Sequence, residues 1–117
     1  MRQIDHFIAG GTGGLAAARK APVYDPNSGE IQAEVTLGGQ DALDRAVAAA
    51  QAAQPAWAAT NPQRRARVMF NFKALVEANR DELAHILSSE HGKVIADSKG
   101  DIQRGLEVIE FCCGIPH

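Results

Sequence analysis

Cysteine is scarce in this sequence of 117 residues, which contains only the neighbouring pair Cys112 and Cys113. Adjacent cysteines on a helix point away from each other and rarely pair, so we expect no disulfide framework. The opening residues MRQIDHFIAGG contain no apolar run of the length found in secretory signals. Both observations fit a reducing compartment, and we expect a cytoplasmic protein.

An excess of basic residues and a long apolar run are also missing. The formal net charge is −2, whereas nucleic-acid binding usually needs a basic face. No stretch approaches the roughly 20 apolar residues of a membrane span. We therefore expect neither nucleic acid nor a membrane as a partner. The length is that of a single domain, and the composition, 45% hydrophobic and 22% charged, is typical of a globular protein.

Short alternating runs and turn formers dominate residues 1–37. The segment IDHFIAGG predicts a short strand, which GGTGG (10–14) ends. GGTGG does not have the G-x-G-x-x-G spacing of a phosphate-binding loop, and a turn is the better interpretation. IQAEVTL (31–37) alternates apolar and polar residues with the period of a half-buried strand. The turn signal DPNSG (25–29) joins it to the preceding APVY, which predicts a hairpin.

Helical periodicity begins at Gly38 and predicts four helices in residues 38–117. Pro55 should end the first helix near Gln54 and leave Trp57 in the connection. Thr60 and Gln63 have the spacing of a capping box at the start of the second helix.

Further signals mark the other two helices. Asn79 is the expected N-cap of the third and Gly92 its C-cap. The fourth helix should run from Ile95 to Cys113. Each helix has an apolar stripe, formed in turn by Leu43, Ala46, Val47, Ala50 and Ala53; Val68, Met69, Phe72, Leu75 and Val76; Leu83, Ile86 and Leu87; and Ile102, Leu106, Ile109 and Cys113. The sequence thus predicts a mostly α chain with a small N-terminal β part, a strand plus a hairpin followed by four helices.

The cysteines and histidines offer little chemistry. Cys112 and Cys113 end a helix, where the dipole disfavours a thiolate, and Glu110 disfavours it further. Cys113 also falls on the apolar stripe, so we interpret it as a packing residue and predict no catalytic residue in the chain. The histidines, which are His6, His85, His91 and His117, lie on different elements without metal-ligand spacing. We therefore predict no metal site, and we interpret the basic cluster QRRAR (63–67) as solvated surface.

Arg104 is the candidate binding residue. It shares a helix face with Glu107, Val108 and Phe111 that differs from the apolar stripe. Its neighbour Gly105 costs about 1 kcal/mol of helix propensity relative to alanine, which predicts that another group closely approaches the backbone there. An arginine in such a place can present a bidentate fork to a carboxylate. The alternative is an ordinary i, i+3 ion pair between Arg104 and Glu107, and these residues alone leave both interpretations open.

The order of the segments resembles the opening of an aldehyde dehydrogenase. NSGE (27–30) is similar to the N-P-x-T-G-E turn of that superfamily, with Ser28 in place of threonine, and EHGK (90–93) to its E-x-G-K stretch. The tail QRGLEVIEFCCGIPH resembles the R-G-x-E-x-V-E-F-A-C-G-I-P-H segment of the CoA-acylating methylmalonate-semialdehyde dehydrogenases, with Cys112 in place of alanine.

This resemblance implies that residues 1–117 are the N-terminal part of an α/β enzyme, with the catalytic and most cofactor-binding regions absent. The full-length enzyme would oxidise malonate or methylmalonate semialdehyde, using NAD and CoA, and would form homo-oligomers. This chain alone would be inactive and would bind no cofactor. The family's R-G-x-E arginine, implied to hold the substrate carboxylate, corresponds to Arg104. The alternatives are a free-standing helical interaction module derived from the family and a small dinucleotide-binding domain.

Overall fold

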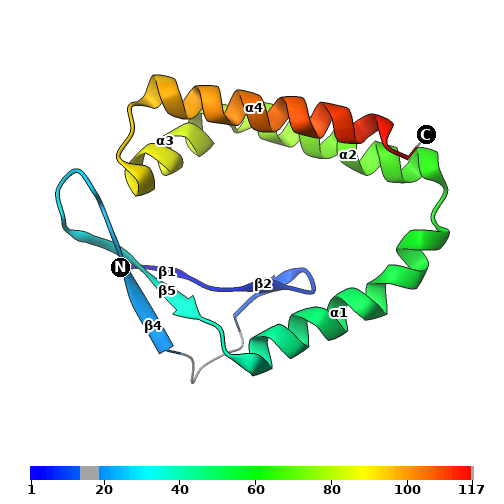
Figure 1. Cartoon of the computed structure of the whole chain (residues 1–117), viewed down its shortest axis with the longest axis horizontal. Helices are drawn as coiled ribbons and strands as arrows, with labels where there is room; N and C mark the ends of the chain where they lie inside the picture. Colours follow the sequence, from blue (N-terminus) through cyan, green and yellow to red (C-terminus); the bar gives the residue numbers. More distant parts are fainter. Residues whose placement is uncertain (14–18, 117) are drawn as a thin grey trace. The chain divides into compact units, whose positions relative to one another are not determined.

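The computed structural model describes residues 1–13 and 19–116. These residues form five strands and four helices, in the order β1 (Arg2–Ile4), β2 (Phe7–Ile8), β3 (Gly11–Thr12), β4 (Arg19–Tyr24), β5 (Ile31–Leu37), α1 (Gln40–Ala59), α2 (Pro62–Ala78), α3 (Arg80–His91) and α4 (Ile95–Gly114) (Figure 1). The predicted mostly α chain with a small N-terminal β part is confirmed. The chain divides into two compact units, Met1–Ala58 and Ala59–His117.

The predicted hairpin forms the larger sheet of the first unit. β4 and β5 pair antiparallel, and β1 adds to the other edge of β5 in parallel, which gives the order β1-β5-β4. Polar side chains link the strands across one face: Gln3 donates to Glu34 at 2.8 Å, and Lys20 donates to Gln3 at 2.7 Å. Ala33 and Thr36 of the central strand are buried.

The DPNSG turn owes its shape to its polar residues. The Asp25 carboxylate accepts a hydrogen bond from the backbone N–H of Asn27 at 2.8 Å, and the Ser28 hydroxyl accepts one from the N–H of Glu30 at 3.3 Å. Gly29 has a φ of 77°, which a residue without Cβ adopts at no steric cost. The turn chemistry read from the sequence is therefore the chemistry that closes the hairpin.

The segment predicted as one short strand is divided in the structure. β1 belongs to the larger sheet, whereas β2 pairs antiparallel with β3. Ala9 and Gly10 connect β2 and β3 with φ values of 54° and 80°, the left-handed conformation that tight two-residue hairpin turns require. GGTGG was expected to end the strand, but its Gly11 and Thr12 form β3. Its last residue, Gly14, lies outside the described residues.

The prediction that Pro55 ends the first helix is wrong. α1 continues through Pro55 to Ala59 and includes Trp57, which was expected in a connection. A proline inside a helix removes one backbone hydrogen bond and crowds the carbonyl four residues earlier. Here the proline is near the helix end, and its neighbours are mostly alanine and exposed. Alanine has the highest helix propensity, and water can solvate the carbonyl that has lost its partner.

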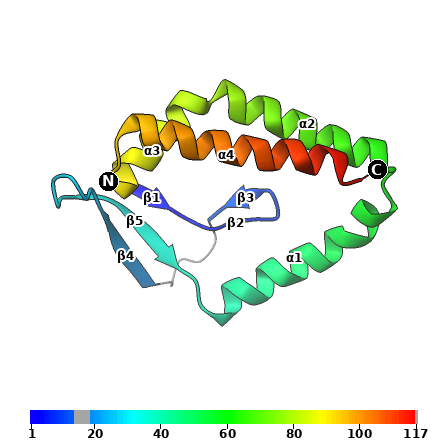
Figure 2. The same cartoon turned by 45° about the horizontal axis from the view of Figure 1, so that its top comes forward.

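Small residues make up most of the core of the second unit. α4 runs alongside α2 and α3 (Figures 1 and 2). The buried side chains are Ala66, Ala84, Ser98, Leu106 and Cys113. Small side chains let helix axes approach closely, and the Ser88 and Ser98 hydroxyls form a 2.7 Å hydrogen bond between α3 and α4.

The helix caps differ partly from the predictions. The N-cap of α2 is Asn61 instead of Thr60, and its side chain accepts a hydrogen bond from the N–H of Gln63 at 2.8 Å. Asn79 holds the N-cap position of α3, but its side chain makes no capping bond and donates to the Leu75 carbonyl of α2 at 2.7 Å. Gly92 is the C-cap of α3 with a φ of 87°, as predicted.

The predicted apolar stripes are buried to different degrees. On α4 the prediction is confirmed, because Leu106 and Cys113 are buried and Ile102 and Ile109 are half-buried. On the other helices many members of the stripes are exposed, namely Leu43, Val47, Val68, Phe72, Leu75 and Ile86. The stripes of α1, α2 and α3 are therefore only partly used for packing within the described residues.

The largest apolar side chains are the most conspicuous part of this exposed surface. The four phenylalanines of the sequence, at positions 7, 70, 72 and 111, are all at least 47% exposed. No helix within residues 1–13 and 19–116 is both long and apolar enough to span a bilayer. The chain thus builds its core from small residues and leaves its aromatic residues uncovered.

Candidate functional site

The connection between α3 and α4 positions the candidate site. Gly92 ends α3 in the left-handed conformation and reverses the chain. Val94 is extended, with φ −68° and ψ 150°, and serves as the N-cap of α4. Lys93 lies between them, and this short connection brings its ammonium group back onto the second turn of α4.

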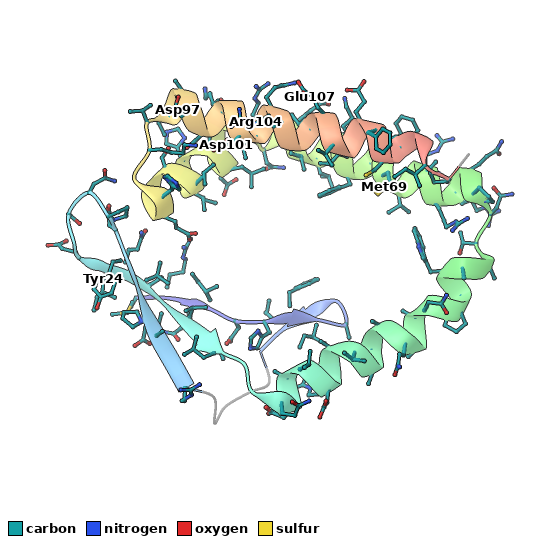
Figure 3. The ribbon with its side chains drawn as sticks, in the orientation of Figure 1. Tyr24, Met69, Asp97, Asp101, Arg104 and Glu107 are labelled. Carbon is teal, nitrogen blue, oxygen red and sulfur yellow. The ribbon has the colours of Figure 1, made fainter. Side chains whose placement is uncertain are left out.

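Asp101 joins two cationic side chains there. Its Oδ2 accepts a hydrogen bond from Nζ of Lys93, and its Oδ1 accepts one from Nη2 of Arg104. Figure 3 shows Asp101 and Arg104 projecting from neighbouring turns of α4. The side chains of Lys93 and Asp101 are only 21% and 31% exposed, whereas that of Arg104 is 69% exposed. The cluster Lys93–Asp101–Arg104 therefore has a sheltered inner pair and an outward-facing guanidinium.

This arrangement leaves binding capacity on Arg104. The cluster contains two positive charges and one negative charge. A guanidinium has five N–H donors, and the hydrogen bond to Asp101 occupies one of them. An anionic group with two oxygens, such as a carboxylate, matches the remaining donors in charge and geometry.

The surface beyond Arg104 is apolar. Val108 and Phe111 follow it on the same face of α4, at spacings of four and seven residues, and are 62% and 74% exposed. Glu107 is on the adjacent part of the helix (Figure 3). A small molecule with a carboxylate at one end and carbon atoms behind it would meet a cation first and apolar side chains next.

The sequence offered an ion pair with Glu107 as the alternative role of Arg104, and the structure shows a different partner. Arg104 pairs with Asp101, while Glu107 accepts a long 3.4 Å hydrogen bond from Gln103. Helical side chains lean toward the N-terminus of their helix, so Arg104 reaches back to Asp101 more readily than forward to Glu107. The signal was present in the sequence, since Asp101 precedes Arg104 by three residues. The contribution of Lys93 was missed, because it depends on how the loop folds back.

The close approach predicted at Gly105 is not found in the part of the chain that the structure describes. A Cβ placed on Gly105 would meet no atom within 4 Å. The nearest feature of this kind is at Gly100, whose added Cβ would lie 3.8 Å from Nη1 of Arg104.

The two cysteines lie in different environments at the end of α4. Both are free thiols; Cys112 is half-buried, and Cys113 is 4% exposed and packs in the core. The placement of Cys113 on the buried stripe is confirmed.

Three further titratable groups, Asp81, His85 and Lys99, form surface contacts. Lys99 of α4 donates a 2.8 Å hydrogen bond to Asp81 of α3, and this bond lowers the pKa of the Asp81 carboxyl below its ordinary value. His85 contacts the Asp81 carbonyl oxygen at 2.7 Å. Residues 1–13 and 19–116 contain no group of three or more His, Cys, Asp or Glu side chains placed to hold a metal ion. His117 lies outside the described residues.

Comparison with known proteins gives one consistent family. Residues 15–117 match the model of the aldehyde dehydrogenase family. A malonate-semialdehyde dehydrogenase of Pseudomonas aeruginosa is 38% identical over 111 residues, which are 95% of this chain and 22% of that protein. A malonate-semialdehyde dehydrogenase of Bacillus pumilus is 38% identical over 116 residues, 99% of this chain and 24% of that protein.

A solved structure shares both the fold and the sequence. The protein from Sinorhizobium meliloti 1021 described as a methylmalonate-semialdehyde dehydrogenase, crystallised with NAD, superposes with a TM-score of 0.95 and 52% identity. The match covers 100% of this chain and 24% of that one. The chain thus spans about a quarter of the length of the relatives it matches.

Proposed function

Because the chain belongs to the aldehyde dehydrogenase family, we propose that it is the N-terminal segment of an enzyme that oxidises a short semialdehyde carrying a carboxylate. Malonate semialdehyde and methylmalonate semialdehyde are the candidate substrates. The names of the similar proteins from Pseudomonas aeruginosa, Bacillus pumilus and Sinorhizobium meliloti support this choice.

The observation that carries the proposal is the exposed, partly unsatisfied guanidinium of Arg104. The semialdehydes differ from ordinary short aldehydes by a carboxylate. Arg104 offers the planar, charged fork that recognises this group, and the exposed Val108 and Phe111 lie beyond it on the same helix. The role we assign to Arg104 is therefore substrate binding, and we assign no chemical step to it.

The cofactors are assigned to the rest of the enzyme. NAD accepts the hydride and CoA accepts the acyl group in the proposed reaction, and the Sinorhizobium meliloti protein was solved with NAD. The turn after β2 does not fit a pyrophosphate, because it leads into β3, whereas a pyrophosphate is held where a strand turns into the N-terminus of a helix. We derive no step through NAD or CoA, and we expect the 117-residue chain alone to be inactive.

The exposed aromatic residues support assembly with further protein. None of the phenylalanines is buried within the described residues, and exposed apolar patches of this kind usually mark contacts with further protein. In our proposal the remaining part of the enzyme and other subunits of a homo-oligomer cover these residues. A cytoplasmic location also belongs to the proposal, since adjacent free thiols fit a reducing compartment.

The rival function is a free-standing helical interaction module. It shares the exposed apolar surface but gives Arg104 no substrate to bind. A chimera distinguishes the two, in which this chain replaces the matching quarter of the Sinorhizobium meliloti protein. The enzyme hypothesis expects NAD-dependent oxidation of malonate semialdehyde by the chimera, whereas a module that has lost compatibility with the enzyme gives none.

Arg104→Ala in this chimera tests the binding role. It removes a charge-assisted hydrogen bond worth about 1.5–3 kcal/mol, so kcat/KM for malonate semialdehyde should fall roughly ten- to a hundredfold. Propanal, which has no carboxylate, should be oxidised nearly as before, and Arg104→Lys should recover only part of the loss. Equal proportional losses for both aldehydes, together with a lower melting temperature, would reduce Arg104 to a structural residue.

A further inference from the structure

We propose that Asp101 is a positioning residue for substrate recognition: anchored by Lys93, it holds the guanidinium of Arg104 in the orientation that accepts the substrate carboxylate. The inference rests on the proposed function of Arg104 and extends it to residues for which no role has been assigned. Asp101 and Lys93 would contact Arg104 and each other, without touching the substrate.

The geometry separates the two oxygens of the Asp101 carboxylate. Oδ2 faces Lys93 and Oδ1 faces Arg104. A single carboxylate therefore connects the α3–α4 loop to the second and third turns of α4. The side chains of Lys93 and Asp101 are mostly sheltered, at 21% and 31% exposure, so their pair is less screened than an ordinary surface ion pair.

The order of burial indicates which partner is the anchor. Arg104 is the outermost member of the cluster at 69% exposure, and a long side chain in that position would otherwise sample many rotamers. Fixing such a side chain only when substrate binds weakens binding. With Asp101 already held by Lys93, the hydrogen bond from Nη2 restricts Arg104 before the substrate arrives.

Charge decides whether this arrangement helps or hinders the substrate. An aspartate beside an arginine can also neutralise it and repel an anionic ligand. Lys93 offsets this effect, because its positive charge compensates the charge of Asp101 and leaves the cluster with a net positive charge. A cluster of Asp101 and Arg104 alone would be neutral overall. The lysine thus allows the aspartate to orient Arg104 without cancelling its attraction for a carboxylate.

The test compares variants in the chimera with the Sinorhizobium meliloti protein. Asp101→Asn keeps the size of the side chain and removes the charge that holds both cations. We expect kcat/KM for malonate semialdehyde to fall roughly tenfold, mainly through KM, while kcat/KM for propanal stays within about twofold. Asp81→Asn is the matched control, because Asp81 also joins α3 to α4 through a lysine, Lys99, but does not contact Arg104. It should change neither value.

Two outcomes would overturn the inference. If Asp101→Asn raises kcat/KM for the semialdehyde, then Asp101 competes with the substrate instead of positioning Arg104. If it lowers the values for both aldehydes equally, its role is structural. Arg104→Ala, measured in parallel, shows whether the proposed function itself fails. If this variant shows no selective loss of kcat/KM for the semialdehyde, neither Arg104 nor Asp101 has the role we propose. If Arg104→Ala shows that selective loss and Asp101→Asn does not, only the positioning role of Asp101 is wrong.

A second variant keeps the test decisive if Asp101→Asn does not fold. Lys93→Met preserves the length of the side chain and leaves the contact between Asp101 and Arg104, but it removes the anchor and the compensating charge. We expect a smaller loss of roughly threefold, again confined to the semialdehyde and visible in KM. An unchanged value, or an equal loss for both aldehydes, would contradict the proposal.

Discussion

At the scale of single residues, the contacts between α3 and α4 show how similar ion pairs acquire different roles. Lys99–Asp81 and Lys93–Asp101 both connect the α3 side to α4. The first is open to water, with Asp81 77% exposed. The second is more sheltered, and its aspartate also accepts a hydrogen bond from Arg104. We therefore propose that the first pair contributes to stability and the second to substrate recognition.

The Asp81–Lys99 pair predicts a pH dependence of stability. The hydrogen bond from Lys99 lowers the pKa of Asp81 below its ordinary value of 3.8 in the folded state. The folded state thus favours the ionised carboxyl, so the pair stabilises the fold above pH 3.8, and the effect is lost as the pH falls through the lower folded-state pKa. In thermal melts, the melting temperature of the wild type should be higher than that of Asp81→Asn at pH 7. The difference between the two melting temperatures should shrink toward zero near about pH 2.

Lys73 provides the control with the opposite sign. The hydrogen bond to Glu77 raises the pKa of Lys73 above 10.5, so the ammonium form is favoured at neutral pH and its contribution is lost as the pH rises through the folded-state value. Lys73→Met should therefore lower the melting temperature at pH 7, because it removes the favoured ammonium group. A difference between wild type and Asp81→Asn that stays constant from pH 7 to about pH 2 would contradict the role of the Asp81 ionisation.

At the scale of elements, α1 shows the limits of a local breaker signal. Pro55 was expected to end the helix, yet α1 extends past it to Ala59. An interior proline typically costs about 3 kcal/mol or more, so the structure predicts that Pro55→Ala stabilises the chain. We expect a higher melting temperature and no loss of helical circular dichroism. A lower melting temperature would mean that the proline ring makes a packing contact that the helix needs.

The elements that could be predicted from sequence depend on local chemistry. The DPNSG turn, the β4–β5 hairpin, the Gly92 cap and the stripe of α4 each follow from residues within a few positions of one another. The parallel pairing of β1 with β5 joins residues about thirty positions apart, and no local pattern reports it. The N-cap of α2 is Asn61 instead of the predicted Thr60. Both residues have suitable side chains, and only the backbone geometry selects between them.

The candidate site was predictable to the same extent. Arg104 was found from its helix face and from a resemblance in the tail motif. Asp101 was within reach of the same reasoning, once the N-terminal lean of helical side chains is considered. Lys93 was not, since its position depends on the left-handed Gly92 before it and the extended Val94 after it in the loop.

At the scale of the whole molecule, the distribution of apolar residues is unlike that of an independent domain. The buried apolar residues are mostly alanine, with Leu106 and Cys113, while Phe72 and Phe111 remain 47% and 74% exposed. Fully burying a phenylalanine contributes about 1.5–3 kcal/mol of favourable free energy. Burying several exposed phenylalanines at an interface would therefore favour association. The 117-residue chain on its own should therefore bind to itself.

The route of this association can be predicted from the surfaces available. β4 is an edge strand that contains Pro22, and a proline protects a strand edge against pairing because it has no backbone N–H. The apolar faces of α2 and α4 have no such protection. We therefore expect the chain to form dimers or larger species through its helices, with the average mass in multi-angle light scattering rising with concentration.

Charged substitutions on these helices test that route. Phe72→Lys combined with Phe111→Lys places charges on both exposed faces and should shift the chain toward the monomer. Asn71→Lys combined with Ala74→Lys adds the same charge at exposed polar and small positions of α2, and should leave the association largely intact. A strict monomer for the wild-type chain over a wide concentration range would contradict the prediction, and equal effects of the two double variants would show that net charge, rather than the aromatic surface, controls assembly.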